Sequence, residues 1–420
     1  MSGTGPSLRI VRLANFVTPV SGGLRTALHH LGAGYRAAGH EPVLVIPGPA
    51  AGDRMTAQGR VITLPGPPLP GTGGYRVLGG RGGLKTLLER LRPDRLEVSD
   101  RTTLRWTGEW ARRHGIPAAM VSHESASGLL RTWGLPDPAA RRLADRLNAG
   151  TAVCYDTVVC TTGWAAAEFQ RIGARNVVRA PLGVDLEHHH PGLRDPGLRG
   201  RYAGPGQVLL VLCSRLSPEK RPDRALDCLA ELRRRGVPAV LAVAGDGPLR
   251  RRLAARAAAQ GLPVHLLGHL ADRAALAALL ATADVVVAPG PVETFGLAAL
   301  EALACGTPVA VSRSSALPQI VGCAGSAADD SGPGFADAVQ HLLARPEADR
   351  RAAARARAEG FGWPAAVAAF LAVHGAGAAA GPQPTTAART QSTSGRCEAI
   401  SDQVSPSSAL ANTSPLRLPK

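Results

Sequence analysis

The chain has 420 residues, of which 45% are apolar and 4% aromatic, so it is long enough for two or three domains with cores built from Leu, Val and Ala. Its net charge of +16 suits nucleic acid or an anionic membrane surface. The Arg residues, however, are spread over the predicted helices without aromatic-interleaved strands or a recognition-helix pattern, so we predict that nucleic acid is not a partner.

Two features of the sequence bear on its compartment. Seven cysteines are scattered along the chain, their number is odd, and none forms a C-x-x-C pair, which is typical of reduced thiols in a cytoplasmic protein. The first residues contain no signal-peptide apolar run, and no stretch reaches the ~18 apolar residues that a membrane span needs. We therefore expect a cytoplasmic protein that is soluble or rests on the inner face of the plasma membrane.

The chain opens with a strand–helix–strand unit of the dinucleotide-binding kind. We predict a strand at residues 8–15, a helix at 24–38 and a second strand at 43–46. Gly22 and Gly23, at the start of the helix, let a phosphate approach backbone amides, although a plain strand-to-helix turn would contain the same pair. Because the pair is not part of a G-x-G-x-x-G sequence, NAD is not predicted.

A Pro/Gly-rich run at residues 65–83 follows a third predicted strand at 61–64 and is typical of a binding loop. Residues 84–91 are predicted to form a short helix with a leucine stripe, surrounded by cations at Arg81, Lys85, Arg90 and Arg92. Two interpretations stay open. Either the cations and a partly inserted leucine hold the first domain on an anionic bilayer, or the stripe belongs to the core and the cations are solvated.

The first sheet is completed by predicted strands at residues 95–98, 118–122, 156–161 and 177–180, with a helix at 103–114. His123 directly follows one of these strands, at the sheet edge where ligands bind in such folds. A lone His is usually structural, but this position favours a functional role. Pro181 to Asp185 is predicted to be the exit from this domain. The run His188-His189-His190 is predicted to be a solvated linker, because no further metal ligand lies near it in the sequence.

A second α/β unit follows the linker. Predicted strands at 208–213, 239–244, 264–267, 283–288 and 309–312 alternate with helices, which is typical of a parallel sheet. Ala/Arg-rich helices then cover residues 346–370, with a break near Gly362-Trp363-Pro364. From Gly375 the composition is mostly Gly, Ala, Pro, Ser and Thr, which predicts disorder. We therefore predict domains at 8–186 and 187–363 and a disordered tail at 375–420.

The segment Pro289–Pro308, PGPVETFGLAALEALACGTP, offers the groups that a nucleotide sugar needs. Glu293 precedes a helix predicted from about Phe295 to Cys305, and Glu301 lies inside it among apolar residues. A carboxylate in that setting requires hydrogen-bond donors, and the two hydroxyls of a ribose suit it. The free amides of Phe295, Gly296 and Leu297 at the helix start suit a phosphate. The bland alternative is a helix with an ordinary salt-bridged Glu.

Polar residues after two other strands complete the predicted donor site. Arg215 and Lys220 follow the strand at 208–213, and two such cations stabilise a diphosphate that leaves with new negative charge. They would otherwise be two exposed cations of a basic protein. No D-x-D sequence occurs, so we predict neither a metal nor another cofactor. Asp272 could accept two hydrogen bonds from guanine, or it could simply cap the helix that starts near Arg273.

The Glu293–Glu301 segment resembles the E-x7-E signature of family 4 retaining glycosyltransferases, which have the GT-B fold. The resemblance covers about residues 8–374 and implies two Rossmann-like domains facing a central cleft, with residues 364–374 crossing back to the first domain. In that family the second Glu binds the donor ribose and the first lies against the transferred sugar. The family also has an Arg and a Lys on the diphosphate, a His beside the sugar, and a glycine loop over the phosphate, matching Arg215, Lys220, His123 and Gly22-Gly23.

Within that family, the stretches LEVSDRTTL, APLGVDL and APGPVETFGLAALEALACGTPVAVSR look most like actinobacterial GDP-mannose-dependent α-mannosyltransferases that act on lipid acceptors. The resemblance assigns acceptor binding to the loop that contains Thr72 and Arg76. Gly71 departs from it, because a Tyr is expected there.

The sequence thus predicts a retaining, metal-independent hexosyltransferase that moves mannose from GDP-mannose to a lipid-linked acceptor of the phosphatidylinositol or diacylglycerol type. An anionic membrane surface is a further expected partner. Two alternatives remain: a transferase for a soluble acceptor that uses a UDP- or GDP-sugar, and a nucleotide-sugar-binding protein without activity. The presence of both glutamates and both cations argues against the last.

Overall fold

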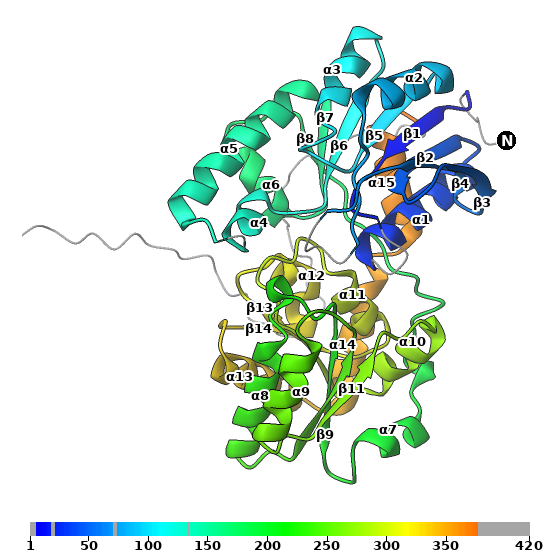
Figure 1. The fold of residues 1–420 in the computed structure, drawn as a ribbon. Helices are drawn as coiled ribbons and strands as arrows, with labels where there is room; N and C mark the ends of the chain where they lie inside the picture. Colours follow the sequence, from blue (N-terminus) through cyan, green and yellow to red (C-terminus); the bar gives the residue numbers. More distant parts are fainter. Residues whose placement is uncertain (1–5, 18–21, 70–73, 133, 377–420) are drawn as a thin grey trace, which may run out of the picture. The chain divides into compact units, whose positions relative to one another are not determined.

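The computed structural model describes residues 6–17, 22–69, 74–132 and 134–376, which belong to the unit considered below. The unit contains two β-sheets of different size, each covered by helices (Figure 1). The part of the tail that lies beyond residue 376 is outside the described residues, so its predicted disorder stays a prediction.

The first sheet has eight strands in the order β3-β4-β2-β1-β5-β6-β7-β8, all parallel except for the β3–β4 pair. Its strands are β1 (Arg9–Leu13), β2 (Glu41–Gly48), β3 (Gly52–Thr56), β4 (Gly59–Pro65), β5 (Arg95–Val98), β6 (Ala118–Ser122), β7 (Thr157–Cys160) and β8 (Val177–Arg179). Its helices are α1 (Gly23–Ala37), α2 (Arg81–Leu91), α3 (Trp106–Arg113), α4 (Ala126–Thr132), α5 (Asp137–Cys154) and α6 (Gly163–Gln170).

The second sheet has six parallel strands in the order β11-β10-β9-β12-β13-β14. They are β9 (Val208–Cys213), β10 (Ala239–Ala244), β11 (Val264–Gly268), β12 (Val285–Ala288), β13 (Val309–Ser312) and β14 (Gly325–Ala328). The helices are α7 (Pro196–Tyr202), α8 (Asp223–Arg234), α9 (Arg250–Ala259), α10 (Arg273–Thr282), α11 (Leu297–Ala304), α12 (Leu317–Val321), α13 (Gly332–Leu343), α14 (Glu347–Glu359) and α15 (Trp363–Val373), with single 3-10 turns η1 (Pro191–Leu193), η2 (Pro218–Lys220) and η3 (Gly322–Ala324).

The central strands of both sheets are buried on both faces, which explains their continuous apolar sequences. In β1, Ile10 belongs to the hydrophobic cluster that contains α1 and α15, whereas Val11 belongs to the cluster of α2 and α3. In β9, Leu209 and Leu210 divide in the same way between two clusters. Successive side chains of a strand point to opposite faces, so each strand supplies two helix layers.

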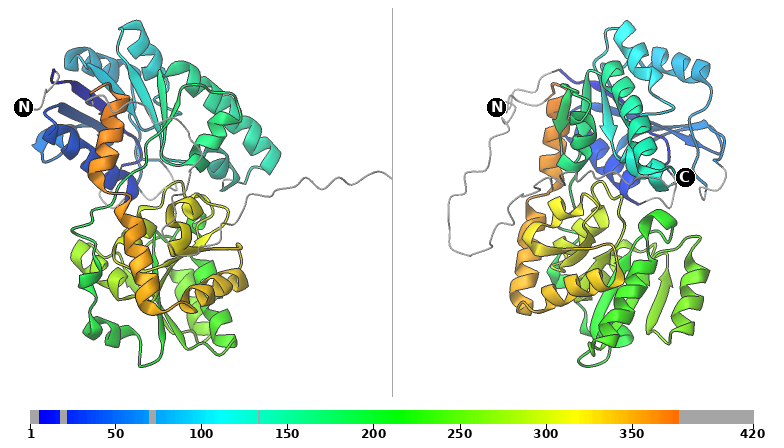
Figure 2. Two further views of the ribbon diagram at one scale, coloured as in Figure 1. Left: turned by 180° about the vertical axis from the view of Figure 1, so that it is seen from behind. Right: turned by 90° about the vertical axis from the view of Figure 1, so that its left-hand side faces the viewer.

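The chain passes between the two sheets twice, and the two passages are bonded to each other. Val184 in the predicted linker forms a β-bridge with Gly362, and its N–H donates to the carbonyl of Phe361 at 2.8 Å. Helix α15 begins one residue later and packs on α1 of the first sheet (Figure 2, left). The expected return of the last helix to the first domain is therefore confirmed.

A buried carboxylate fastens this returning helix. Glu97 of β5 is 1% exposed and accepts from Arg12 Nε at 2.8 Å, from the Tyr35 hydroxyl at 2.7 Å, and lies 3.0 Å from His374 Nε2 just after α15. Burial alone would raise the pKa of Glu97, but the Arg12 guanidinium and the His374 ring hold it well below its usual range. This ion network therefore joins β1, β5, α1 and the end of α15.

The structure contradicts one sequence-based expectation and decides between two interpretations that the sequence left open. His189, predicted to be solvated, is 3% exposed, because its N–H and ring bond to the Asp185 carbonyl and its own carbonyl accepts from Arg355. The leucine stripe of α2 cannot insert into a bilayer, because its members are all core residues of the first sheet: Leu84, Leu87, Leu88 and Leu91. The core interpretation of that helix is the right one for its leucines.

Several elements were not predicted at all. They are β3, α4, α5, α6, α7, α12 and β14, which are short or polar, or lack a clear apolar period. Helix α11 covers Leu297–Ala304 rather than the predicted Phe295 to Cys305, because Gly296 lies in the left-handed region and serves as its N-cap.

We predict that Glu97→Gln lowers the free energy of unfolding by about 3 kcal/mol at pH 7, because it leaves Arg12 buried without its counter-charge. Urea unfolding followed by circular dichroism measures this. The folded-state pKa of Glu97 lies below its ordinary 4.5, so the carboxylate stabilises the protein above about pH 4.5 and loses this effect as the pH falls further. The difference between wild type and variant should therefore narrow below pH 4.5.

Glu41→Gln is the matched control, because Glu41 pairs with Arg9 at 2.7 Å on the surface. That change should cost less than about 1 kcal/mol. Equal losses for the two variants would contradict the role assigned to Glu97.

Candidate active site

The loop between β12 and α11 carries Glu293, and an ion pair fixes this residue. Lys220 Nζ, in the turn η2 after β9, lies 2.5 Å from Glu293 Oε1. The backbone of the loop is held by Ala316, whose N–H donates to the Glu293 carbonyl at 2.9 Å, and by Arg224, which donates to the Pro289 carbonyl at 3.1 Å. Two residues predicted to act together, 73 positions apart, are thus in direct contact.

The ion pair keeps Lys220 charged. Burial would lower the pKa of Lys220, but Glu293 outweighs this and raises it. The ammonium group therefore remains a cation throughout the physiological range, as a group that neutralises phosphate must.

The start of α11 presents free backbone donors beside this pair. Gly296 has φ +74°, and a Cβ there would lie 2.2 Å from the Leu317 side chain, so only glycine fits. Within the described part of the chain, no acceptor is bonded to the N–H groups of Phe295, Gly296 or Leu297. The Phe295 side chain itself is core. Phe295 could therefore contribute to a ligand site only through its amide, and phosphate binding by that amide stays a prediction.

A second helix start lies next to the first. Gly23 is the first residue of α1, and a Cβ placed on it would be 3.8 Å from Leu297 Cδ1, in van der Waals contact. Gly22 is the N-cap of α1, and a Cβ placed on it would have no heavy atom of the described residues within 4 Å. The predicted glycine turn of the first half and the predicted phosphate-binding amides of the second half are therefore neighbours.

Glu301 is the second predicted ligand-binding carboxylate, and helix α11 carries it. It lies in the second turn of α11, half-buried, and no hydrogen bond to its side chain is formed by any described residue. Burial raises the pKa of Glu301 to about 7, although the charge of Arg273 opposes the shift. Burial and the neighbouring Glu301 likewise raise the pKa of the Cys213 thiol to about 12. An acceptor in this state is suited to ligand hydroxyls.

His123 lies immediately after β6 and approaches the Glu293 loop. Its Nε2 is 3.1 Å from Ser99 Oγ, and its backbone carbonyl accepts a hydrogen bond from the Thr294 hydroxyl. Burial lowers the pKa of His123 to about 4; Glu97 opposes this shift, and the cations Arg12 and Arg101 add to it. The imidazole is therefore neutral at pH 7.

Arg215, which follows β9, contacts Tyr75 of the loop predicted to bind the acceptor. Its guanidinium is 5.1 Å from the ring centroid of Tyr75, and the edge of Phe16 meets the same ring at 6.0 Å. The described ends of the loop are bonded to each other: Leu69 N–H donates to the Tyr75 carbonyl at 2.8 Å and Arg76 donates to the Gly66 carbonyl at 2.6 Å. Thr72 and Gly71 lie outside the described residues.

Asp272 caps α10. Its Oδ1 accepts from the N–H of Ala274 at 2.9 Å, and the residue is exposed. The helix-cap interpretation is thus confirmed, and recognition of guanine by the other carboxylate oxygen stays a prediction.

Sequence reasoning missed the residues that connect these groups. Thr294, Thr162 and Tyr75 bridge the two halves, and Arg224 supports the loop. The sequence offered one indication of a role for Thr294, because this residue lies between the predicted site residues Glu293 and Phe295. The partners of the others lie far away in the sequence, so no local pattern marks them.

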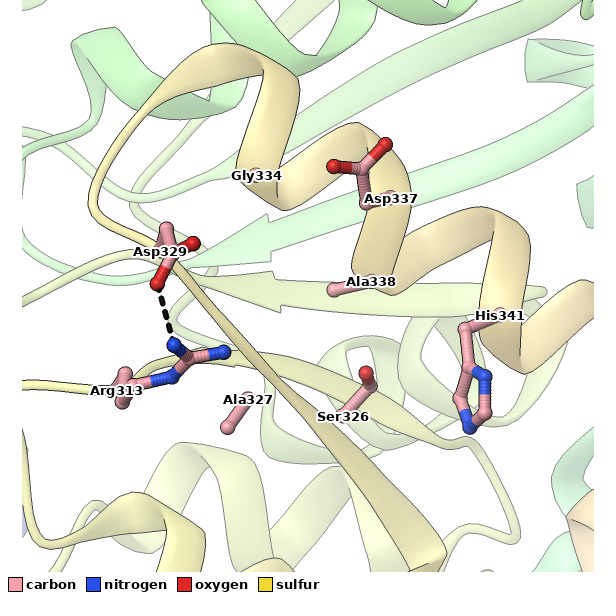
Figure 3. Close-up of a pocket in the computed structure, with 8 residues that line it drawn as sticks. All are labelled: Arg313, Ser326, Ala327, Asp329, Gly334, Asp337, Ala338 and His341. Carbon is pink, nitrogen blue, oxygen red and sulfur yellow. Dashed lines mark ion pairs between the residues drawn. The ribbon is translucent and has the colours of Figure 1, made fainter. Parts of the chain in front are cut away.

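Two other hollows contain none of the predicted site residues. One, of about 210 Å³, lies between β13, β14 and α13, where Arg313 pairs with Asp329 at 2.7 Å (Figure 3). The other, of about 400 Å³, lies between α3 and α5. Across the described residues there is no group of three or more His, Cys, Asp or Glu side chains placed to hold a metal ion. The helices of the described part include none with the length and apolarity of a membrane span.

Comparison with known proteins matches both halves of the chain to glycosyl transferase domains. Residues 22–183 match the glycosyl transferase 4-like domain, and residues 203–359 match the glycosyl transferases group 1. The chain is 53% identical over 371 residues, 88% of its length and 96% of the relative's, to a GDP-mannose-dependent alpha-(1-6)-phosphatidylinositol dimannoside mannosyltransferase of Mycobacterium tuberculosis. It is 34% identical to a D-inositol 3-phosphate glycosyltransferase of Frankia alni, covering 61% of this chain and 67% of the other.

Solved structures agree on the fold. Sucrose-phosphate synthase from Thermosynechococcus elongatus superimposes with a TM-score of 0.70 at 20% identity, covering 86% of this chain and 96% of that one. Anabaena HepE in complex with UDP and glucose gives 0.67 at 18% identity, covering 87% and 98%. The fold is therefore GT-B, as expected, and the chain belongs to the group 1 glycosyl transferases and is a glycosyltransferase.

Proposed function

We propose that this enzyme transfers mannose from GDP-mannose to a lipid-linked acceptor of the phosphatidylinositol or diacylglycerol type, with retention of configuration and without a metal ion. The main support for this proposal is that three separate segments of the chain bring together Glu293, Lys220, His123 and the amides at the start of α11. The mycobacterial relative, at 53% identity, is a GDP-mannose-dependent mannosyltransferase of a phosphatidylinositol dimannoside, which supports the choice of GDP-mannose and of a lipid acceptor.

The donor is proposed to bind on the second half. The ribose hydroxyls donate to Glu301, whose carboxylate has no donor among the described residues. The diphosphate lies at the amides of Phe295–Leu297 and the Gly22-Gly23 turn, which are adjacent. Lys220 and Arg215 supply two positive charges there. This leaves the transferred sugar between Glu293 and His123.

The reaction proceeds without a protein nucleophile in this proposal. The acceptor oxygen attacks the anomeric carbon from the face that the diphosphate leaves. The carbon–phosphate oxygen bond breaks as the new glycosidic bond forms. The acceptor proton passes to an oxygen of the departing GDP. Lys220, Arg215 and the α11 amides stabilise the charge that GDP gains, which is the part a metal performs in other transferases. The neutral imidazole of His123 can hydrogen-bond the sugar without adding a positive charge near Arg12 and Arg101.

A donor panel tests this function. The purified enzyme is incubated with GDP-mannose, a UDP-hexose and an ADP-hexose against a lipid extract of actinobacterial membranes, with and without EDTA, and products are identified by mass spectrometry. We expect hexose transfer from GDP-mannose alone, into material that extracts into organic solvent, at a rate that EDTA does not change.

Each other outcome contradicts a stated part of the proposal. Loss of turnover in EDTA that a divalent ion restores would contradict metal independence. Product that stays in the aqueous phase would favour a soluble acceptor. Absence of turnover with every donor, together with measurable GDP binding, would favour a binding protein.

Glu301→Gln should weaken GDP binding by about tenfold to a hundredfold, because a ribose hydroxyl bonded to a charged acceptor contributes roughly 1.5–3 kcal/mol. Isothermal titration calorimetry measures the affinity. The ribose favours the ionised carboxylate, and the pKa of Glu301 is about 7 in the free protein. Affinity of the wild type should therefore rise between pH 6 and 8 more steeply than that of the variant.

Glu359→Gln is the control for Glu301, because Glu359 makes only a surface pair with Arg355 at 2.9 Å. It should leave GDP binding unchanged. Unchanged affinity in Glu301→Gln as well would remove Glu301 from the donor site.

We propose further that the enzyme is cytoplasmic and rests on the inner face of the membrane through the cations of α2. Their leucine neighbours are core, so attraction to the bilayer is electrostatic only. Lys85 is 3.8 Å from Glu89, a weak pair, and the Arg81 guanidinium lies 5.9 Å from the Trp106 ring centroid. Each cation near an anionic surface contributes about 1 kcal/mol, so four together give binding that salt reverses.

Replacing Arg81, Lys85, Arg90 and Arg92 together by Ser should release the enzyme from phosphatidylserine-containing liposomes in sedimentation at low salt, without altering GDP affinity. The control removes four exposed arginines of the second half: Arg201, Arg233, Arg251 and Arg252. Equal release by both variants would show a general charge effect. A wild type that never sediments with the liposomes would rule out this surface.

A further inference from the structure

One threonine of the second half is bonded to the first half on two sides. The side chain of Thr294, which is 8% exposed, donates its hydroxyl proton to the backbone carbonyl of His123. The backbone carbonyl of the same residue accepts from the Thr162 hydroxyl at 3.0 Å. Thr294 directly follows Glu293 and precedes Phe295, so these bonds act in the middle of the proposed reaction centre.

The partners of Thr294 are rigid parts of the first half. Thr162 is the N-cap of α6, where its Oγ1 also accepts from the Ala165 N–H at 3.1 Å. His123 follows β6, Thr162 follows β7 by one residue, and these neighbouring strands pair through Ser122 and Cys160. The carbonyl after His123, that of Glu124, accepts from the buried Arg101 guanidinium. Two adjacent strand ends thus form a fixed platform.

Glu293, one peptide away from Thr294, is fixed to the second half instead. Its carboxylate pairs with Lys220, and its carbonyl accepts from Ala316 at 2.9 Å. Because a peptide unit is planar and stiff, adjacent residues bonded to different halves set the distance between the groups that each half carries. Misplacement of reacting groups by about 1 Å costs on the order of a hundredfold in rate.

We infer that Thr294 and Thr162 are positioning residues. Each hydroxyl donates to a backbone carbonyl of the other half, and together they align His123 of the first half with Glu293 of the second for sugar transfer. Neither touches the reacting atoms; they act through His123 and Glu293. The inference rests on the proposed function and extends it to residues outside the donor and acceptor sites.

The chemistry of threonine suits this role. Its β-branched side chain has few rotamers, so the hydroxyl is directed with little loss of side-chain freedom. Valine keeps the branching and volume but cannot donate. Serine keeps the donor and loses only a methyl group. The two replacements therefore separate the hydrogen bond from packing.

The test measures initial rates and GDP affinity of variants of the full chain. Thr294→Val should lower kcat by about tenfold or more while the KM for GDP-mannose and the Kd for GDP change by less than about twofold. Thr294→Ser should restore most of kcat. Thr162→Val should resemble Thr294→Val, and the double variant should lose less than the product of the two single losses, since both bonds serve one alignment.

Thr107→Val is the matched control, because Thr107 is fully buried in α3 and its hydroxyl donates to the Leu104 carbonyl at 2.7 Å within the first half. It should lower the melting temperature without lowering kcat. A Thr294→Val enzyme with wild-type kcat, or one that serine does not rescue, would overturn the inference.

Hydrogen exchange gives a readout that does not need turnover. In the GDP-bound protein, Thr294→Val should speed exchange at residues 122–128 and 160–166, and Thr107→Val should not. If the wild type transfers no mannose but this difference is present, the proposed function fails and the alignment stands. If exchange at both segments is unchanged, the alignment is rejected whatever the activity.

Discussion

The buried carboxylate of Glu97 is the interaction on which the arrangement depends. It collects Arg12, Tyr35 and His374 in the core of the first sheet, and His374 is the residue at which α15 ends. Helix α15 is thereby tied to the first sheet by charge as well as by packing on α1. Arg12 is the main counter-charge of this buried carboxylate and His374 adds to it, so the end of α15 helps to keep Glu97 ionised. The same charge partly offsets the burial that keeps His123 neutral.

The proposed site uses its two glutamates in opposite ways. Glu293 is already paired with Lys220, so its position is fixed before any ligand binds. Glu301 accepts no hydrogen bond from the described residues, and burial raises its pKa to about 7. A carboxylate that is already paired fixes the geometry of the site. A carboxylate without a protein donor instead gains hydrogen bonds, and so binding free energy, from the hydroxyl groups of a ligand. The helix that carries Glu301 also supplies the free amides, so one short element provides both kinds of contact.

How far the sequence predicts this arrangement depends on how local each signal is. Some signals are properties of short segments, and the structure contains them as expected. They are the apolar strand runs, the glycines at the helix starts (Gly23 and Gly296) and the Glu293–Glu301 spacing. Burial of His189 and of the α2 leucines depends on what packs over them, which no window of sequence contains. Glu97 is unremarkable in sequence for the same reason. The bond from Thr294 to His123 spans 171 positions.

The two halves, each built around its own sheet, must be held in a defined relative orientation. The passages at Val184 and Gly362 lie side by side, so alone they leave the halves able to rotate about one axis. Contacts at a distance from that axis must select the productive orientation. The Thr294 and Thr162 hydroxyl groups form such contacts, and so does the Arg215 guanidinium on Tyr75. Thr294 adjoins Glu293 and Phe295, and Arg215 is itself a proposed donor ligand. If the donor binds as proposed, its binding and the orientation of the two halves are therefore expected to be coupled.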